Sequence, residues 1–251
     1  MSTDAMFDAA RAAGAPIEEA IGLFMLHPET FAESVAAGYT NPLAGYVAGR
    51  AGVLGEASAA AVDSAFVVFE PATLGALWGD GVAVHGATGA AERYWEQLAG
   101  FARRHLTGAE GLGRIAELGE KIIAAVPNGA LPLFAGWRTM PLADDAPARA
   151  LQVMFVLREM RAGVHFNALN LSGISAVEAH MLNKGAEYTR MFGWPEPFAD
   201  GADKKDLYSE VEQWTNRRMA QIYTDALDAG EAAELARFST AALAALKADI
   251  S

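Results

Sequence analysis

Two arginines, a glutamate and a histidine stand close together in the apolar segment Leu151 to His165. Arg158, Arg161 and His165 follow the i, i+3, i+7 spacing that places side chains on one face of a helix. The other faces carry mainly valine, leucine and methionine, and a helix that is apolar nearly all round is buried. The arginines and Glu159 must therefore form ion pairs inside the protein or line a cavity.

Two interpretations of this segment are open from the sequence. In the structural interpretation, a buried network of arginine and glutamate joins neighbouring helices. In the functional interpretation, Arg158 and Arg161 line a cavity and bind a carboxylate or phosphate group through their planar guanidinium groups. Glu159 and His165 are then candidates for proton transfer, and we name both as candidate catalytic residues.

Tyr46 and Arg50 form a second candidate pair. They lie four residues apart in a helix predicted to begin at Pro42, so their side chains can meet on one helix face. Gly45, Gly49 and Gly52 in the same segment indicate that another backbone or a ligand approaches closely. These glycines form no dinucleotide-binding motif, because no strand precedes them. Tyr46 is the third candidate catalytic residue. The simpler alternative is that Tyr46 and Arg50 are part of an ordinary helix surface.

A metal site is a weaker alternative. Glu178 and His180, together with Glu159 and His165, supply two carboxylates and two imidazoles, a set that suits iron or zinc. The Glu-x-x-His spacing of di-iron bundles is missing, so a metal-dependent oxygenase ranks last. No nucleophile elbow, His-Glu-x-x-His pair or phosphate loop is present either. The sequence therefore names no cofactor.

Composition excludes several partner classes. The chain of 251 residues has a net charge of −12, and its densest basic spots are only two pairs, Arg103-Arg104 and Arg217-Arg218. We therefore expect no binding to nucleic acid. Cysteine is absent, which excludes disulfides and cysteine-ligated metal sites. Apolar runs are too short to span a membrane, and residues 1–14 lack the order of a signal peptide, so we expect a cytoplasmic protein that contacts no membrane.

High alanine content and helical periodicity predict an all-α fold of roughly ten to twelve helices. Helix starts are predicted at Pro16, Pro28 and Pro42. Residues 82–106 and 110–126 are predicted to form a helical hairpin, and residues 127–147, with four prolines, an irregular connection. A break near Gly193 suggests a main helical domain over residues 1–192, which holds the candidate pocket. Residues 193–251 would be a helical extension packed on it.

Three strings of the sequence resemble a known family. Residues 44–55 (AGYVAGRAGVLG), 133–138 (LFAGWR) and 157–165 (LREMRAGVH) are similar to an actinobacterial family of all-helical, helix-turn-helix-like proteins of unknown function. The matching positions are Tyr46, Arg50, Leu54, Gly55, Arg138, Arg158, Glu159, Arg161, Glu178 and His180. The last two, Glu178 and His180, lie after the three strings, in a later part of the chain. Met160 departs from the family, which has a histidine at that position. The resemblance covers about residues 16–192 and implies that a C-terminal winged-helix-like module is truncated here.

The matching strings extend the candidate ligand-binding set to Arg50, Arg138, Arg158, Arg161, Trp137, Glu178 and His180. We expect Arg50 and Arg138 to share one pocket with Arg158, with aromatic side chains as its apolar wall. The predicted function is a pocket for a small, anionic organic molecule. One form of it is an enzyme of specialised metabolism that uses arginine and histidine for charge stabilisation and proton transfer. The alternative is a non-enzymatic ligand sensor or partner-binding protein derived from a regulator. A homo-oligomer is compatible with either.

Overall fold

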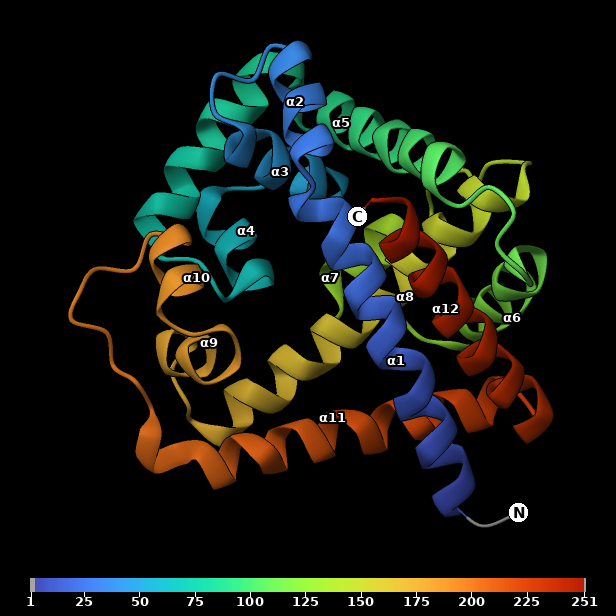
Figure 1. The fold of residues 1–251 in the computed structure, drawn as a ribbon. Coiled ribbons are helices and arrows are strands. Elements are labelled where there is room, and N and C mark those ends of the chain that lie inside the picture. The colour runs from blue at the N-terminus through green and yellow to red at the C-terminus, as the bar shows by residue number, and fades with distance from the viewer. Residues whose placement is uncertain (1–2, 251) are drawn as a thin grey trace.

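The computed structural model describes residues 3–250, and this range forms twelve α-helices, two short 3-10 helices and no strand (Figure 1). The predicted all-α fold is confirmed. The helices are α1 (Thr3–Leu26), α2 (Pro28–Ala36), α3 (Pro42–Ala51), η1 (Gly52–Leu54), α4 (Ala59–Phe66), α5 (Pro71–His105), α6 (Leu112–Ala125), α7 (Pro132–Trp137), α8 (Ala146–Ser172), α9 (Ala176–Lys184), α10 (Ala186–Met191), η2 (Ala202–Lys204), α11 (Lys205–Ala226) and α12 (Ala229–Asp249).

Two of the three helix starts predicted at proline are confirmed. Pro28 and Pro42 open α2 and α3, where a preceding side chain accepts a hydrogen bond from the first turn. The predicted start at Pro16 is wrong, because Pro16 lies inside α1. The alanine-rich residues before it are helical, and Met6 and Ala10 on that segment are buried in the core. We infer that this burial outweighs the backbone hydrogen bond that proline cannot donate.

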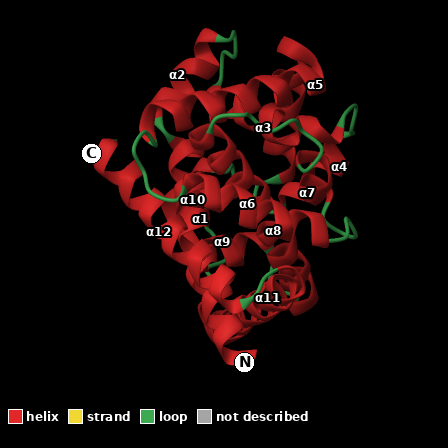
Figure 2. Cartoon of the chain, turned by 90° about the vertical axis from the view of Figure 1, so that its right-hand side faces the viewer, coloured by secondary structure: helices red, strands yellow, loops and turns green. Residues whose placement is uncertain are grey.

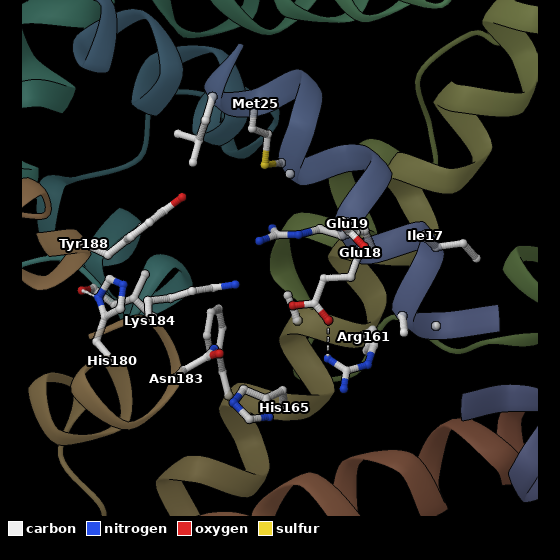
Figure 3. Close-up of a pocket in the computed structure, with 18 of the residues that line it drawn as sticks. Ile17, Glu18, Glu19, Met25, Arg161, His165, His180, Asn183, Lys184 and Tyr188 are labelled. Atoms are coloured by element: carbon white, nitrogen blue, oxygen red, sulfur yellow. Dashed lines mark hydrogen bonds and ion pairs between the residues drawn. The ribbon is translucent and has the colours of Figure 1, made fainter. Parts of the chain in front are cut away.

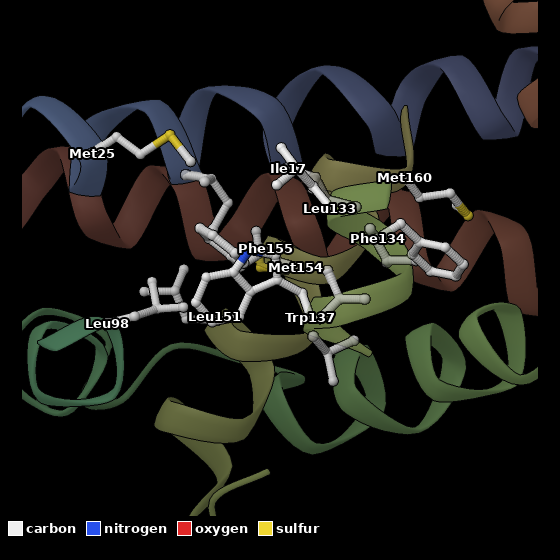
Figure 4. Close-up of a cluster of buried hydrophobic side chains, with 14 of the residues drawn as sticks. Ile17, Met25, Leu98, Leu133, Phe134, Trp137, Leu151, Met154, Phe155 and Met160 are labelled. Atoms are coloured by element: carbon white, nitrogen blue, oxygen red, sulfur yellow. The ribbon is translucent and has the colours of Figure 1, made fainter. Parts of the chain in front are cut away.

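Helix α8 crosses the middle of the molecule and contacts α1, α5, α6, α7 and α11 (Figure 1). It begins after Asp145, whose side chain accepts from the first turn, and ends at Gly173 in the left-handed conformation. Its first half is buried, with Leu151, Met154 and Phe155 in one apolar cluster with Trp137 (Figure 4). Its second half is only half-buried. The helix thus belongs to the core at one end and is open to a cavity at the other.

The C-terminal helices pack into the same core as the rest of the chain. Helices α11 and α12 contact α1 and α6, and α1 and α12 lie next to one another in the side view of Figure 2. Tyr223 of α11 and Leu246 of α12 belong to the main apolar cluster. The predicted hairpin of α5 and α6 is wrong, since α6 packs instead on α8, α11 and α12. The predicted irregular segment 127–147 contains the short helix α7.

The length and hydropathy of the helices in residues 3–250 bear on whether any of them could span a membrane. No single helix there is long and apolar enough to cross a membrane. Only α4 and α5 taken together have the length and composition, and they are bent by 119°.

Helix α3 lies unusually close to α5 because glycine stands at their contact. A Cβ atom on Gly81 of α5 would lie 2.5 Å from the carbonyl oxygen of Ala44 and 2.5 Å from the Cβ of Ala48. Both distances are shorter than real Cβ atoms tolerate. The contact holds α3 and its side chains Tyr46 and Arg50 in place.

We expect Gly81→Ala to lower the free energy of unfolding by about 1–3 kcal/mol, because the added methyl group forces two backbones apart. Gly79→Ala on the same helix is the matched control, since a Cβ there would meet nothing within 4 Å. That change should stabilise the protein by about 0.5–1 kcal/mol through the higher helix propensity of alanine. Urea denaturation followed by circular dichroism measures both, and equal effects of the two substitutions would contradict the packing argument.

Candidate functional site

Helices α1, α3, α8, α9, α10 and α11 surround a cavity of about 980 Å³ (Figure 3). This volume lies at the upper end of the usual range for small-molecule sites. Apolar side chains such as Leu23, Met25 and Leu169 make up part of its wall. Its polar wall includes several of the residues singled out from the sequence: Tyr46, Arg50, Arg158, Arg161, His165 and His180.

Arg50 of this wall forms a buried ion pair with Glu159. Arg50 Nε and Nη2 donate to the two carboxylate oxygens of Glu159 at 2.8 and 2.9 Å, and the residues are 1% and 2% exposed. Burial alone would raise the pKa of Glu159, but the charges of Arg50 and Arg158 outweigh it and lower that pKa. Arg50 also donates to the hydroxyl of Tyr46 at 3.1 Å. The structural interpretation therefore holds for Arg50 and Glu159.

Arg158 has a different environment, because it shares the same carboxylate. Its Nη1 donates to Glu159 Oε1 at 2.9 Å, on the oxygen that Arg50 Nε already uses. Two positive charges thus face one negative charge at this point of the wall. The side chain of Arg158 is 20% exposed and lines the cavity. Arg158 therefore keeps donor groups and positive charge available to a bound anion.

Arg161 is charge-balanced by two carboxylates. Its two Nη atoms donate to Glu18 of α1 and Glu212 of α11, each at 2.9 Å, and Figure 3 shows the pair with Glu18. The three residues join α1, α8 and α11. His165, one turn further on α8, has its Nδ1 3.2 Å from Thr215 Oγ1 and 3.4 Å from Glu212 Oε1. Burial, more than any neighbouring charge, lowers its pKa, so its imidazole is mainly neutral at pH 7.

Three predicted ligand-binding residues lie outside the cavity wall. Arg138 donates to the carbonyl oxygen of Val126 at the end of α6 and to Asn128 Oδ1, so it caps a helix, and the expectation that it shares a pocket with Arg158 is wrong. Trp137 is fully buried and donates to the carbonyl oxygen of Arg50 at 3.0 Å.

Glu178 likewise has a capping role. It is the third residue of α9 and completes a capping box with Ser175, and it also pairs with Lys204 at 2.6 Å. These hydrogen bonds, with that to Lys204 the largest contribution, lower the pKa of Glu178 to about 2. The four proposed metal ligands therefore do not converge, and residues 3–250 contain no group of three or more histidine or acidic side chains placed to hold a metal ion.

Two groups of cavity residues escaped the sequence interpretation. Lys184 of α9 lines the cavity and forms no ion pair among residues 3–250. Lys184 lies four residues after His180, so both side chains are on one face of the helix. This spacing could have identified Lys184 as a cavity residue from the sequence. Glu212 and Tyr208 of α11 also line the cavity. They lie in the segment assigned to a C-terminal extension, and no local pattern links that segment to Arg161.

We expect Glu159→Gln to lower the free energy of unfolding by about 3–5 kcal/mol at pH 7, because it leaves Arg50 buried without a counter-charge. Arg158→Gln should cost only about 0.5–1.5 kcal/mol, since Glu159 keeps its pair with Arg50. Because the pKa of Glu159 is lowered in the folded state, its contribution is present above the ordinary glutamate pKa and is lost as the pH falls through the lowered value. Denaturant titrations between pH 7 and pH 3 measure these effects. Equal losses for the two variants would make Arg158 a structural residue.

The sequence profile of a helix-turn-helix family matches residues 10–250. No curated protein and no solved structure matches. The match includes the C-terminal helices, so the expectation that the resemblance ends at about residue 192 is wrong. An actinobacterial origin and a truncated winged module stay predictions. The chain belongs to this helix-turn-helix family.

Proposed function

We propose that the cavity binds a small organic anion, a carboxylate or a phosphate ester with an apolar body. The observation that carries the proposal is the local excess of positive charge at Arg158, which shares the carboxylate of Glu159 with Arg50. Lys184 adds a second cation to the wall. Unlike Arg158, Lys184 forms no ion pair among the described residues. Excess positive charge in a partly buried wall is unfavourable unless an anion or water compensates it.

The apolar part of the wall supports a ligand with a hydrocarbon or aromatic body. Leu26, Phe166 and Leu169 line the cavity together with Tyr188 and Phe192. Small-molecule sites combine such a surface with a few polar groups that fix the orientation of the ligand. Arg158 suits the second role, because its planar guanidinium can donate two parallel hydrogen bonds to a carboxylate.

An enzyme and a sensor are two forms of this proposal. In an enzyme, Tyr46 and the neutral imidazole of His165 are the proton-transfer candidates, since both line the same cavity as Arg158. Membership of a helix-turn-helix family favours a non-enzymatic, cytoplasmic ligand sensor that derives from a regulator. NMR spectra of a bound acid over hours separate the two forms, since only an enzyme changes the acid chemically.

We expect isothermal titration calorimetry to detect binding of 2-naphthoate, an aromatic carboxylate that fits the cavity by size. Arg158→Gln should weaken it about 10- to 100-fold, the value of a charge-assisted hydrogen bond of about 1.5–3 kcal/mol. Arg237→Gln is the matched control, because Arg237 is exposed, pairs with Glu110 and lies outside the cavity wall. Equal affinities in the wild type and Arg158→Gln, or no binding at all, would contradict the proposal.

Duplex DNA is not the proposed ligand, despite the family. The net charge is −12, and Arg103 and Arg104 are paired with Asp145, Glu29 and Glu33. We expect fluorescence anisotropy to give no sub-micromolar binding to labelled duplex DNA at 150 mM salt, because long-range repulsion opposes phosphate contacts. Sub-micromolar binding that weakens steeply with salt, and that the double variant Arg217→Gln/Arg218→Gln abolishes, would show that this expectation is wrong.

A further inference from the structure

His180 is a buried histidine whose hydrogen bond determines its tautomer. The ring nitrogen Nδ1 lies 3.3 Å from the carbonyl oxygen of Val68, and the residue is 5% exposed. A carbonyl oxygen can only accept a hydrogen bond, so this contact assigns the proton to Nδ1; Trp194 Nε1 donates to the same oxygen at 2.9 Å. Burial lowers the pKa of His180, and the positive charge of Lys184 acts in the same direction, against the bond to Val68. The imidazole is therefore neutral at pH 7, and Nε2 has a free lone pair.

The Nε2 atom is available to the cavity. Nδ1 and Nε2 are the two neighbours of Cε1, and their hydrogen-bonding directions diverge in the plane of the ring, so Nε2 does not point at the carbonyl group of Val68. His180 lines the cavity, and Nε2 has no hydrogen-bond partner within the described part of the chain (Figure 3). The ring is held in this orientation by Phe192, whose centroid lies 4.9 Å away. A fixed acceptor thus stands on the cavity wall.

A cation accompanies this acceptor on the same helix. Lys184 follows His180 by one turn of α9, and its ammonium group extends into the cavity (Figure 3). Arg158 contributes a second cation from α8. A ligand with only an acidic group would use the two cations and leave Nε2 of His180 without a donor. A ligand that also carries a hydroxyl group would satisfy both kinds of group.

We propose that the cavity selects a hydroxylated organic acid, whose hydroxyl donates to Nε2 of His180 while Arg158 and Lys184 bind the acidic group. This inference rests on the proposed function and names the chemistry of its ligand. It makes His180 a specificity-determining residue, because a site that offers an acceptor rejects the analogue that lacks the donor. His180 and Lys184 share helix α9, and Arg158 lies on α8.

The test compares 2-naphthoate with 6-hydroxy-2-naphthoate by calorimetry at pH 7. In the wild type the hydroxyl should raise affinity about 2- to 12-fold, the equivalent of one net hydrogen bond of about 0.5–1.5 kcal/mol. His180→Phe should remove that gain, so that the ratio of the two affinities falls to about 1, because phenylalanine has no acceptor for the hydroxyl. His85→Phe is the matched control, since His85 bonds to the carbonyl of Ala37 and does not line the cavity.

The outcomes separate the inference from the proposed function. If neither acid binds, both fail. If both acids bind with a dependence on Arg158, but the hydroxyl gives no gain or the gain survives in His180→Phe, only the present inference is overturned. A second measurement needs no variant: long-range ¹H–¹⁵N NMR of the wild type should show His180 as the neutral Nδ1–H tautomer. Its Nε2 resonance should shift with the hydroxylated acid and not with 2-naphthoate. An Nε2–H tautomer or an imidazolium would overturn the inference.

Discussion

The buried carboxylate of Glu159 is the interaction on which the rest of the site depends. Arg50 occupies both of its oxygens, and Arg158 shares one of them. A buried carboxylate with no arginine would take up a proton, and one with a single arginine would leave a neutral pair. Two arginines around one carboxylate leave positive charge at the cavity wall. This local excess of positive charge, rather than any single residue, is the basis on which we propose an anionic ligand.

The fold makes this arrangement through helices that are distant in sequence. Gly81 lets α3 approach α5, which brings Arg50 to Glu159 of α8 across 109 positions of the chain. Trp137 fixes the backbone of Arg50 from α7. Arg161 ties α8 to α1 and α11 at the other end of the cavity. One end of α8 is thus anchored in the apolar core, while the other presents charged side chains to the cavity.

Local patterns in the sequence predict the helices but only part of the site. The all-α fold and the helix starts at Pro28 and Pro42 follow from propensity and from capping chemistry. Helical spacing places Arg158, Arg161 and His165 on one face, and all three line the cavity. Arg138 and Glu178 were misjudged because a charged side chain that caps a helix has the same residue type as one that binds a ligand. The charge balance of Arg161 was not predictable, since it needs Glu18 and Glu212 from helices with no sequence link to α8.

We expect Arg158, and neither Arg50 nor Arg161, to be the arginine that meets an anion in the cavity. NMR of the arginine side-chain N–H groups during a titration with 2-naphthoate tests it most directly, with Arg158→Gln to assign the Arg158 signal. We expect the Arg158 resonances to shift with saturation, while those of Arg50 and Arg161 stay in place, because each of these two arginines already donates two hydrogen bonds to carboxylates. Shifts at Arg161 or Arg50 with none at Arg158 would show that this expectation is wrong.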